Sequence, residues 1–87
     1  MQHSDLTKLE ERVREVARKS ALGRHLGNVR LEAEADDEGS GLLRVLVGVR
    51  ALDEVNDVDL ERLLASIESA LSALDDRFPS VRFEEAA

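Results

Sequence analysis

The chain of 87 residues carries a net charge of −7 and contains no cysteine. A protein this short forms one domain with a small core, and a partner subunit would add to its stability. The acidic balance opposes binding to phosphate backbones and to anionic membranes, so nucleic acid is not an expected partner. The chain shows no signal-peptide pattern, no long apolar run and no disulfide chemistry. These features favour a cytoplasmic location without direct membrane insertion.

The first predicted element is an amphipathic helix over residues 5–22. Its apolar positions recur in steps of three and four, and they are Leu6, Leu9, Val13 and Val16. Charged residues fill the other face, which is typical of a surface helix that packs on a core. Ser4 or Thr7 would cap its start, and Gly23 or Gly27 would supply its end.

Two strands are predicted next. Residues 29–36 alternate apolar and polar with a period of two, which predicts a strand with one solvated face. A turn-rich segment at 37–41 leads into residues 42–52, which are apolar on parts of both faces and are therefore placed in the centre of the sheet. Within this second strand, Gly48 is interpreted as a bulge.

The apolar pattern also predicts how the two strands pair. The expected pairs on the core face are Ala35 with Leu43, Ala33 with Val45, Leu31 with Val47, and Val29 with Val49. The same alignment sets Glu34 opposite Arg44 on the other face, where opposite charges attract. Both faces therefore agree with one register.

A second helix and a last strand complete the chain. Asn56 is expected to cap the helix and Pro79 to end it. The apolar stripe of the helix is Leu60, Leu63, Leu64, Ile67, Leu71, Leu74 and Phe78. Residues 81–84 then alternate as a short strand, which should run parallel to the second strand because strand–helix–strand crossovers are right-handed.

The order of these elements predicts the fold class. We expect residues 1–87 to form a single α+β domain, a two-layer αββαβ sandwich. In it, a three-stranded mixed sheet carries both helices on one face.

No grouping of side chains predicts catalysis. The serines on or near the helices have no histidine nearby in sequence, and none stands in a G-x-S-x-G turn. Gly39 and Gly41 do not open a helix and have no following lysine, which excludes a phosphate-binding loop. We therefore expect a protein that is not an enzyme, with no catalytic or cofactor-binding residues.

Metal binding is expected to be weak at most. The acidic residues gather at 36–38, 53–59 and 75–76. They lack the spacing of a calcium-binding loop and are interpreted mainly as solvated loop and capping residues. A closed structural zinc site is excluded because it needs a full set of Cys or His ligands. The candidate ligands for a weakly bound divalent cation are His25, Asp53 and Asp57.

Leu46 is the candidate centre of a dimer interface. In the predicted register it lies on the face opposite the core, among charged residues, and Leu52 has the same parity. An apolar residue rimmed by charges suits a self-complementary contact. We expect a symmetric homodimer that forms through this outer face or through the edge of the last strand.

Three stretches carry a resemblance to a known family. They are residues 42–50 (LLRVLVGVR), 57–71 (DVDLERLLASIESAL) and 77–85 (RFPSVRFEE). They resemble the cytoplasmic C-terminal domain of cation diffusion facilitator transporters. The resemblance implies a metallochaperone-like domain that forms a homodimer beneath the membrane and senses Zn²⁺ or a similar divalent cation. A membrane transporter or another protein would be its further partner.

One feature of that family is not matched. The family often carries histidines in the second and last strands, where this chain has Val47-Gly48-Val49-Arg50 and Phe83-Glu84-Glu85. The architecture, the small core and the resemblance together make a non-catalytic dimerisation or regulatory module the leading hypothesis. The alternatives are a type II KH-like RNA- or ribosome-associated factor, opposed by the missing G-x-x-G loop and the acidic charge, and a small protein–protein interaction adaptor.

Overall fold

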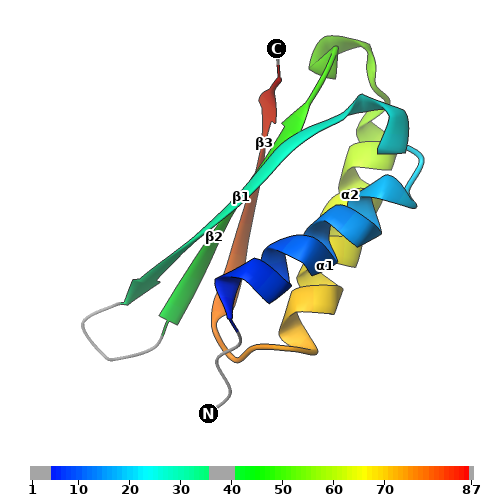
Figure 1. Ribbon diagram of the computed structural model, residues 1–87. Coiled ribbons are helices and arrows are strands. Elements are labelled where there is room, and N and C mark those ends of the chain that lie inside the picture. Colours follow the sequence, from blue (N-terminus) through cyan, green and yellow to red (C-terminus); the bar gives the residue numbers. More distant parts are fainter. Residues whose placement is uncertain (1–4, 36–40, 87) are drawn as a thin grey trace.

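The computed structural model describes residues 5–35 and 41–86 (Figure 1). In chain order its helices and strands are α1 (Leu6–Arg18), β1 (Leu26–Ala35), β2 (Gly41–Val49), α2 (Asp57–Ser72) and β3 (Phe78–Glu85). Two short 3₁₀-helices, η1 (Gly23–His25) and η2 (Leu52–Glu54), lie between them. The predicted αββαβ order is confirmed.

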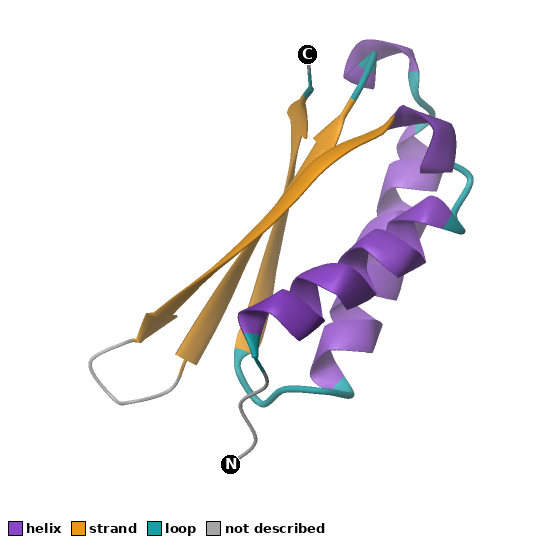
Figure 2. Cartoon of the chain, in the orientation of Figure 1, coloured by secondary structure: helices purple, strands orange, loops and turns teal. Residues whose placement is uncertain are grey.

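The sheet and the helices form two layers (Figure 2). The strand order is β1-β2-β3, with β1 antiparallel and β3 parallel to the central strand β2. Both α1 and α2 cover the same face of the sheet, and the other face is open (Figures 1 and 2). The expected mixed sheet, the central second strand and the parallel last strand are all confirmed.

Helix α1 is shorter than expected. It begins at Leu6 because Asp5 caps it, with the Asp5 carboxylate accepting a hydrogen bond from the Thr7 N–H at 2.8 Å. Thr7 is therefore not the cap, and Ser4 lies outside the described residues. The helix ends at Arg18, where the chain turns so tightly that a side chain at Gly23 would collide with the Arg18 carbonyl. Gly23 therefore does not end the helix, but it allows the chain to pass close to the Arg18 carbonyl after the helix has ended.

The predicted hairpin register is wrong by two residues. The observed pairs include Leu31 with Val45, Val29 with Val47, Ala33 with Leu43, and Glu32 with Arg44. Because side chains alternate with a period of two, this shift leaves every residue on its expected face, and the apolar pattern could not distinguish the two alignments. The expected attraction still forms, since the Arg44 guanidinium reaches the Glu34 carboxylate diagonally at 3.0 Å.

An irregularity in the hairpin lies opposite Gly48. The register shifts between Leu26 and Val29, so the additional residue belongs to β1 and not to Gly48 as expected. A Cβ atom at Gly48 would lie 3.2 Å from backbone atoms of Asn28 and 3.2 Å from the Ala86 side chain. Gly48 therefore lets β1 and the end of the chain approach β2 closely.

Helix α2 begins as expected and ends earlier. Asn56 caps it, and its side-chain oxygen accepts a hydrogen bond from the Val58 N–H at 2.7 Å. The helix ends at Ser72, so Pro79 does not end it, and β3 is longer than the expected 81–84. Pro79 lies within β3, which is an edge strand and can hold a proline without losing a ladder hydrogen bond.

The core lies between the sheet and the two helices. Its buried apolar residues are Leu9, Val13, Ala17, Leu22, Val29, Leu31, Leu43, Val45, Val47, Val49, Leu63, Ile67 and Leu71. Leu74 and Phe78 end the expected helix stripe but are 37% and 66% exposed, because the helix stops before them. No helix in residues 5–35 and 41–86 is both long and apolar enough to span a membrane.

Candidate interaction surfaces

Hydrogen bonds fasten the end of the sheet where β1 begins and β2 ends. The Arg50 N–H donates to the His25 carbonyl at 2.6 Å, and the Arg50 guanidinium donates to the Arg24 carbonyl at 2.9 Å. His25 Nδ1 lies 2.9 Å from the Arg50 carbonyl oxygen. Because a carbonyl can only accept, Nδ1 carries the proton in this contact. Nε2 is then the ring nitrogen that remains available to a ligand.

The three candidate metal ligands lie on different elements. His25 ends η1, Asp53 lies in η2, and Asp57 is the first residue of α2. Within the described part of the chain, no group of three or more His, Asp or Glu side chains is close enough to hold a metal ion. A single copy therefore does not bring His25, Asp53 and Asp57 together as one ligand set, and metal binding by them stays a prediction.

Leu46 lies on the open face of the sheet, as expected. It is half-buried among charged side chains, in a shallow hollow of about 500 Å³ lined by Arg30, Glu32, Arg44, Leu46 and Arg82. Leu52 does not share this face, because β2 ends at Val49 and the chain turns at Ala51, which has a left-handed φ of 53°. Leu52 instead packs against the core from η2. A role for either leucine at an interface stays a prediction.

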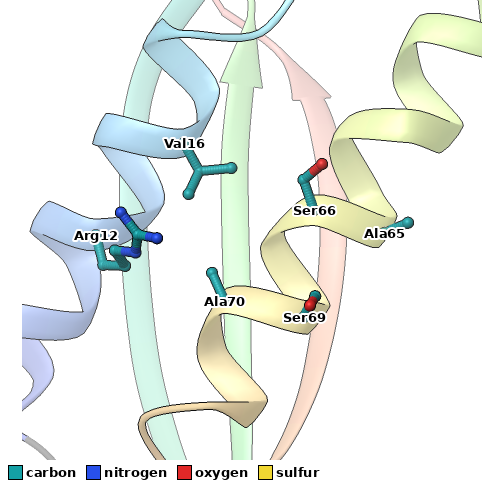
Figure 3. A pocket seen from close by; sticks show the side chains of 6 residues that line it. All are labelled: Arg12, Val16, Ala65, Ser66, Ser69 and Ala70. Carbon is teal, nitrogen blue, oxygen red and sulfur yellow. The ribbon is translucent and has the colours of Figure 1, made fainter.

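A second hollow lies between the two helices (Figure 3). It holds about 470 Å³ and is lined by Arg12, Val16, Ala65, Ser66, Ser69 and Ala70. In Figure 3, Arg12 and Val16 of α1 extend toward the small side chains of α2. No lining residue could act as a base for the two serine hydroxyls, so this hollow offers no nucleophile.

The turn between α2 and β3 contains a buried ion pair that the sequence did not indicate. Asp75 is only 3% exposed, although it was expected to be a solvated loop residue. Its two carboxylate oxygens accept hydrogen bonds from Nε and Nη2 of Arg77, each at 2.9 Å, and one also accepts from the Arg77 backbone N–H at 2.9 Å. The hydrogen bonds to Asp75 raise the pKa of Arg77, while desolvation acts in the opposite direction.

This ion pair positions the start of β3 beside the start of β2. A side chain at Gly41 would collide with the aliphatic part of Arg77, so the two segments are in close contact there. The signal in the sequence was the Asp-x-Arg spacing, since an aspartate often accepts a hydrogen bond from the backbone two residues on. Nothing in that spacing indicates burial.

Solved structures with a similar fold are C-terminal domains of MamM. One variant, with an aspartate and a histidine replaced by alanine, is 14% identical, has a TM-score of 0.59, and matches over 93% of this chain and 94% of that chain. An aspartate-to-asparagine variant is 14% identical with a TM-score of 0.58, over 97% and 96% of the two chains. A copper form is 15% identical with a TM-score of 0.50, over 94% and 89%.

The MamM domain is a cytoplasmic domain of a cation diffusion facilitator, so the resemblance expected from the sequence is confirmed at the level of the fold. No protein-family model and no characterised protein matches at the level of sequence.

Proposed function

We propose that this chain is a non-catalytic dimerisation and regulatory module of the kind found beneath divalent-cation transporters, working in the cytoplasm. The observation that carries the proposal is the likeness to the MamM C-terminal domain over nearly the whole of both chains. Fold alone does not determine function, so the surface of this chain has to supply the rest of the argument.

Two surface features support self-association. One is the open face of the sheet, where Leu46 is surrounded by charged side chains of both signs. The other is the free edge of β3, which has no neighbouring strand within the described residues. A small domain with one layer of helices leaves both surfaces uncovered, and a second copy of the chain can cover either of them.

The first test is the association state of the unmodified chain. We expect sedimentation equilibrium to give a reversible dimer at micromolar to millimolar concentration. Leu46→Glu and Val58→Glu place the same new charge on the open sheet face and on the exposed side of α2. Dissociation by Leu46→Glu alone would place the interface on the open face. A chain that stays monomeric at every concentration would contradict the proposed function.

The regulatory ligand that we propose is a weakly bound divalent cation. A copper form exists among the MamM structures of similar fold. In this chain the available donors are His25 Nε2 and the exposed carboxylates of Asp53 and Asp57. One copy of the chain does not bring these three donors together. A metal site would therefore take ligands from more than one copy, or water molecules would complete the coordination shell of the cation.

Calorimetric titration with Zn²⁺ is expected to show weak binding, with a dissociation constant above the micromolar range. His25→Ala should weaken it further, whereas His3→Ala should leave it unchanged. Loss of a neutral imidazole removes the ligand that zinc prefers among those available. Sub-micromolar affinity at an unshared site within one copy would contradict this expectation.

A further inference from the structure

The free edge of β3 presents an unpaired row of backbone groups. The Ala86 N–H donates to the Val49 carbonyl at 3.0 Å, so residue 86 directs its backbone groups toward β2. Successive residues of a strand direct these groups to opposite sides. Val81, Phe83 and Glu85 therefore direct their N–H and C=O groups toward the free edge. Such an edge pairs readily with another strand.

Two charged side chains beside this edge have no ion-pair partner among residues 5–35 and 41–86. Arg82 and Glu84 are both exposed and lie on the open face of β3. Elsewhere on this face the arginines are paired, Arg44 with Glu34 at 3.0 Å and Arg30 more loosely with Glu32 at 3.7 Å. The unpaired charges of this face are thus confined to β3, one of the two edge strands of the sheet.

The helix side of the same edge is partly apolar. Phe83 is half-buried and lines a hollow of about 290 Å³ together with Leu60 and Leu64 of α2. Asp57 and Glu61 complete the lining of this hollow. Free backbone groups, unpaired charges and a partly apolar hollow therefore lie together along a few residues of β3.

We propose that β3 pairs antiparallel with β3 of a second copy, about a two-fold axis that passes through Phe83. The inference rests on the proposed self-association and assigns it a surface. In this register Phe83 faces the partner's Phe83, and Val81 faces the partner's Glu85. Arg82 then faces the partner's Glu84, and the symmetry repeats that pair. The two sheets join into one continuous sheet.

Other positions of the axis are excluded by charge and by proline. An axis at Arg82 or at Glu84 would set like charges directly opposite each other, which destabilises a strand pair. An axis at Val81 would set Pro79, which has no N–H, opposite the partner's Phe83 and would lose a ladder hydrogen bond. The axis at Phe83 is the one that uses the edge N–H groups of Val81, Phe83 and Glu85.

The geometry of an antiparallel pair favours this register. Phe83 and Val81 would occupy hydrogen-bonded pairs, because their backbone groups face the edge. Arg82 and the partner's Glu84 would occupy non-hydrogen-bonded pairs, in which the Cα atoms lie about 4.5 Å apart and the side chains are closest. The two Phe83 rings would meet over the apolar hollows beside Leu60 and Leu64, which removes that surface from water.

A charge-swap experiment tests the register. Arg82→Glu and Glu84→Arg alone each create two repulsive pairs per dimer, and each is expected to raise the dimer dissociation constant about tenfold or more. The double variant Arg82→Glu/Glu84→Arg restores opposite charges and should return the constant to near its original value. Arg30→Glu makes the same charge change at the other edge of the sheet and should leave it unaltered.

Hydrogen exchange supplies a second readout that does not depend on substitution. The amides of Val81, Phe83 and Glu85 should exchange rapidly at low concentration and become protected as the dimer forms. A dimer that tolerates both single charge reversals, or that dissociates only on Leu46→Glu, would overturn this inference while leaving self-association intact. Single variants that dissociate without rescue in the double variant would overturn the register. A monomeric chain would overturn the proposed function as well.

Discussion

Replacing Asp75 with alanine is expected to lower the free energy of unfolding by about 3–5 kcal/mol, because it removes the carboxylate that pairs with a nearly buried guanidinium. The Arg77 side chain is 11% exposed and the Asp75 side chain is 0% exposed. Alanine at position 75 also removes the acceptor of the Arg77 backbone N–H. Urea denaturation monitored by circular dichroism would measure the loss. A folded domain has total stability of only about 5–15 kcal/mol, so the variant should lose a large share of it.

Two further variants separate the buried charge from ordinary surface effects. Asp53→Ala removes an exposed aspartate and should change stability by less than about 0.5 kcal/mol. The double variant Asp75→Leu/Arg77→Met replaces the ion pair with apolar side chains, and it should be more stable than Asp75→Ala because no uncompensated charge remains. If Asp75→Ala and Asp53→Ala cost the same, the pair does not stabilise the turn before β3.

The fold could be predicted from the sequence because each element has a clear hydrophobic period. The alternation around Val29 and Leu31 and the stripe through Leu63, Ile67 and Leu71 determine which side of each element is buried. The crossover rule then determines that β3 runs parallel to β2. These features depend only on local pattern and on chirality.

The details that failed depend on information that a hydrophobic pattern does not carry. A shift of two residues in the hairpin keeps every side chain on its face. The hydrophobic pattern therefore could not distinguish the observed pairing of Leu31 with Val45 from the predicted pairing of Leu31 with Val47. Helix α2 ends at Ser72 and the Asp75–Arg77 turn comes after it, and the burial of that ion pair is a tertiary effect. Proline was interpreted as a helix stop although an edge strand accepts it equally well.

The candidate surfaces were predicted only in part. The position of Leu46 on the open face follows from strand parity, and it survives the register shift. The position of Leu52 cannot be predicted in this way. Side chains alternate between faces only within a strand, and β2 ends before the chain turns at Ala51. The unpaired charges of Arg82 and Glu84 could not be identified from sequence, since β1 also carries both signs on its open face and its charges are paired.

Replacing Ile67 with alanine should cost about 2–5 kcal/mol, the range for removing a large aliphatic side chain from a core. Ile67 lies in the middle of α2 and is 0% exposed, within the same buried cluster as residues of α1 and of the central strand. Its removal leaves a cavity where both layers meet, and the rigid sheet limits how far the neighbours can relax into it. Chemical denaturation at fixed protein concentration would measure the change, because self-association would add to the apparent stability.

Leu74 provides the matched control for Ile67. It belongs to the same apolar stripe in the sequence, but it lies beyond the end of α2 and is 37% exposed. Leu74→Ala should therefore cost clearly less than Ile67→Ala, and Ile67→Val should cost about 0.5–1.5 kcal/mol because the cavity is smaller. A loss below about 0.5 kcal/mol for Ile67→Ala would mean that α2 presents a different face to the sheet. Equal losses at Ile67 and Leu74 would mean that the helix continues past Ser72 and buries both residues.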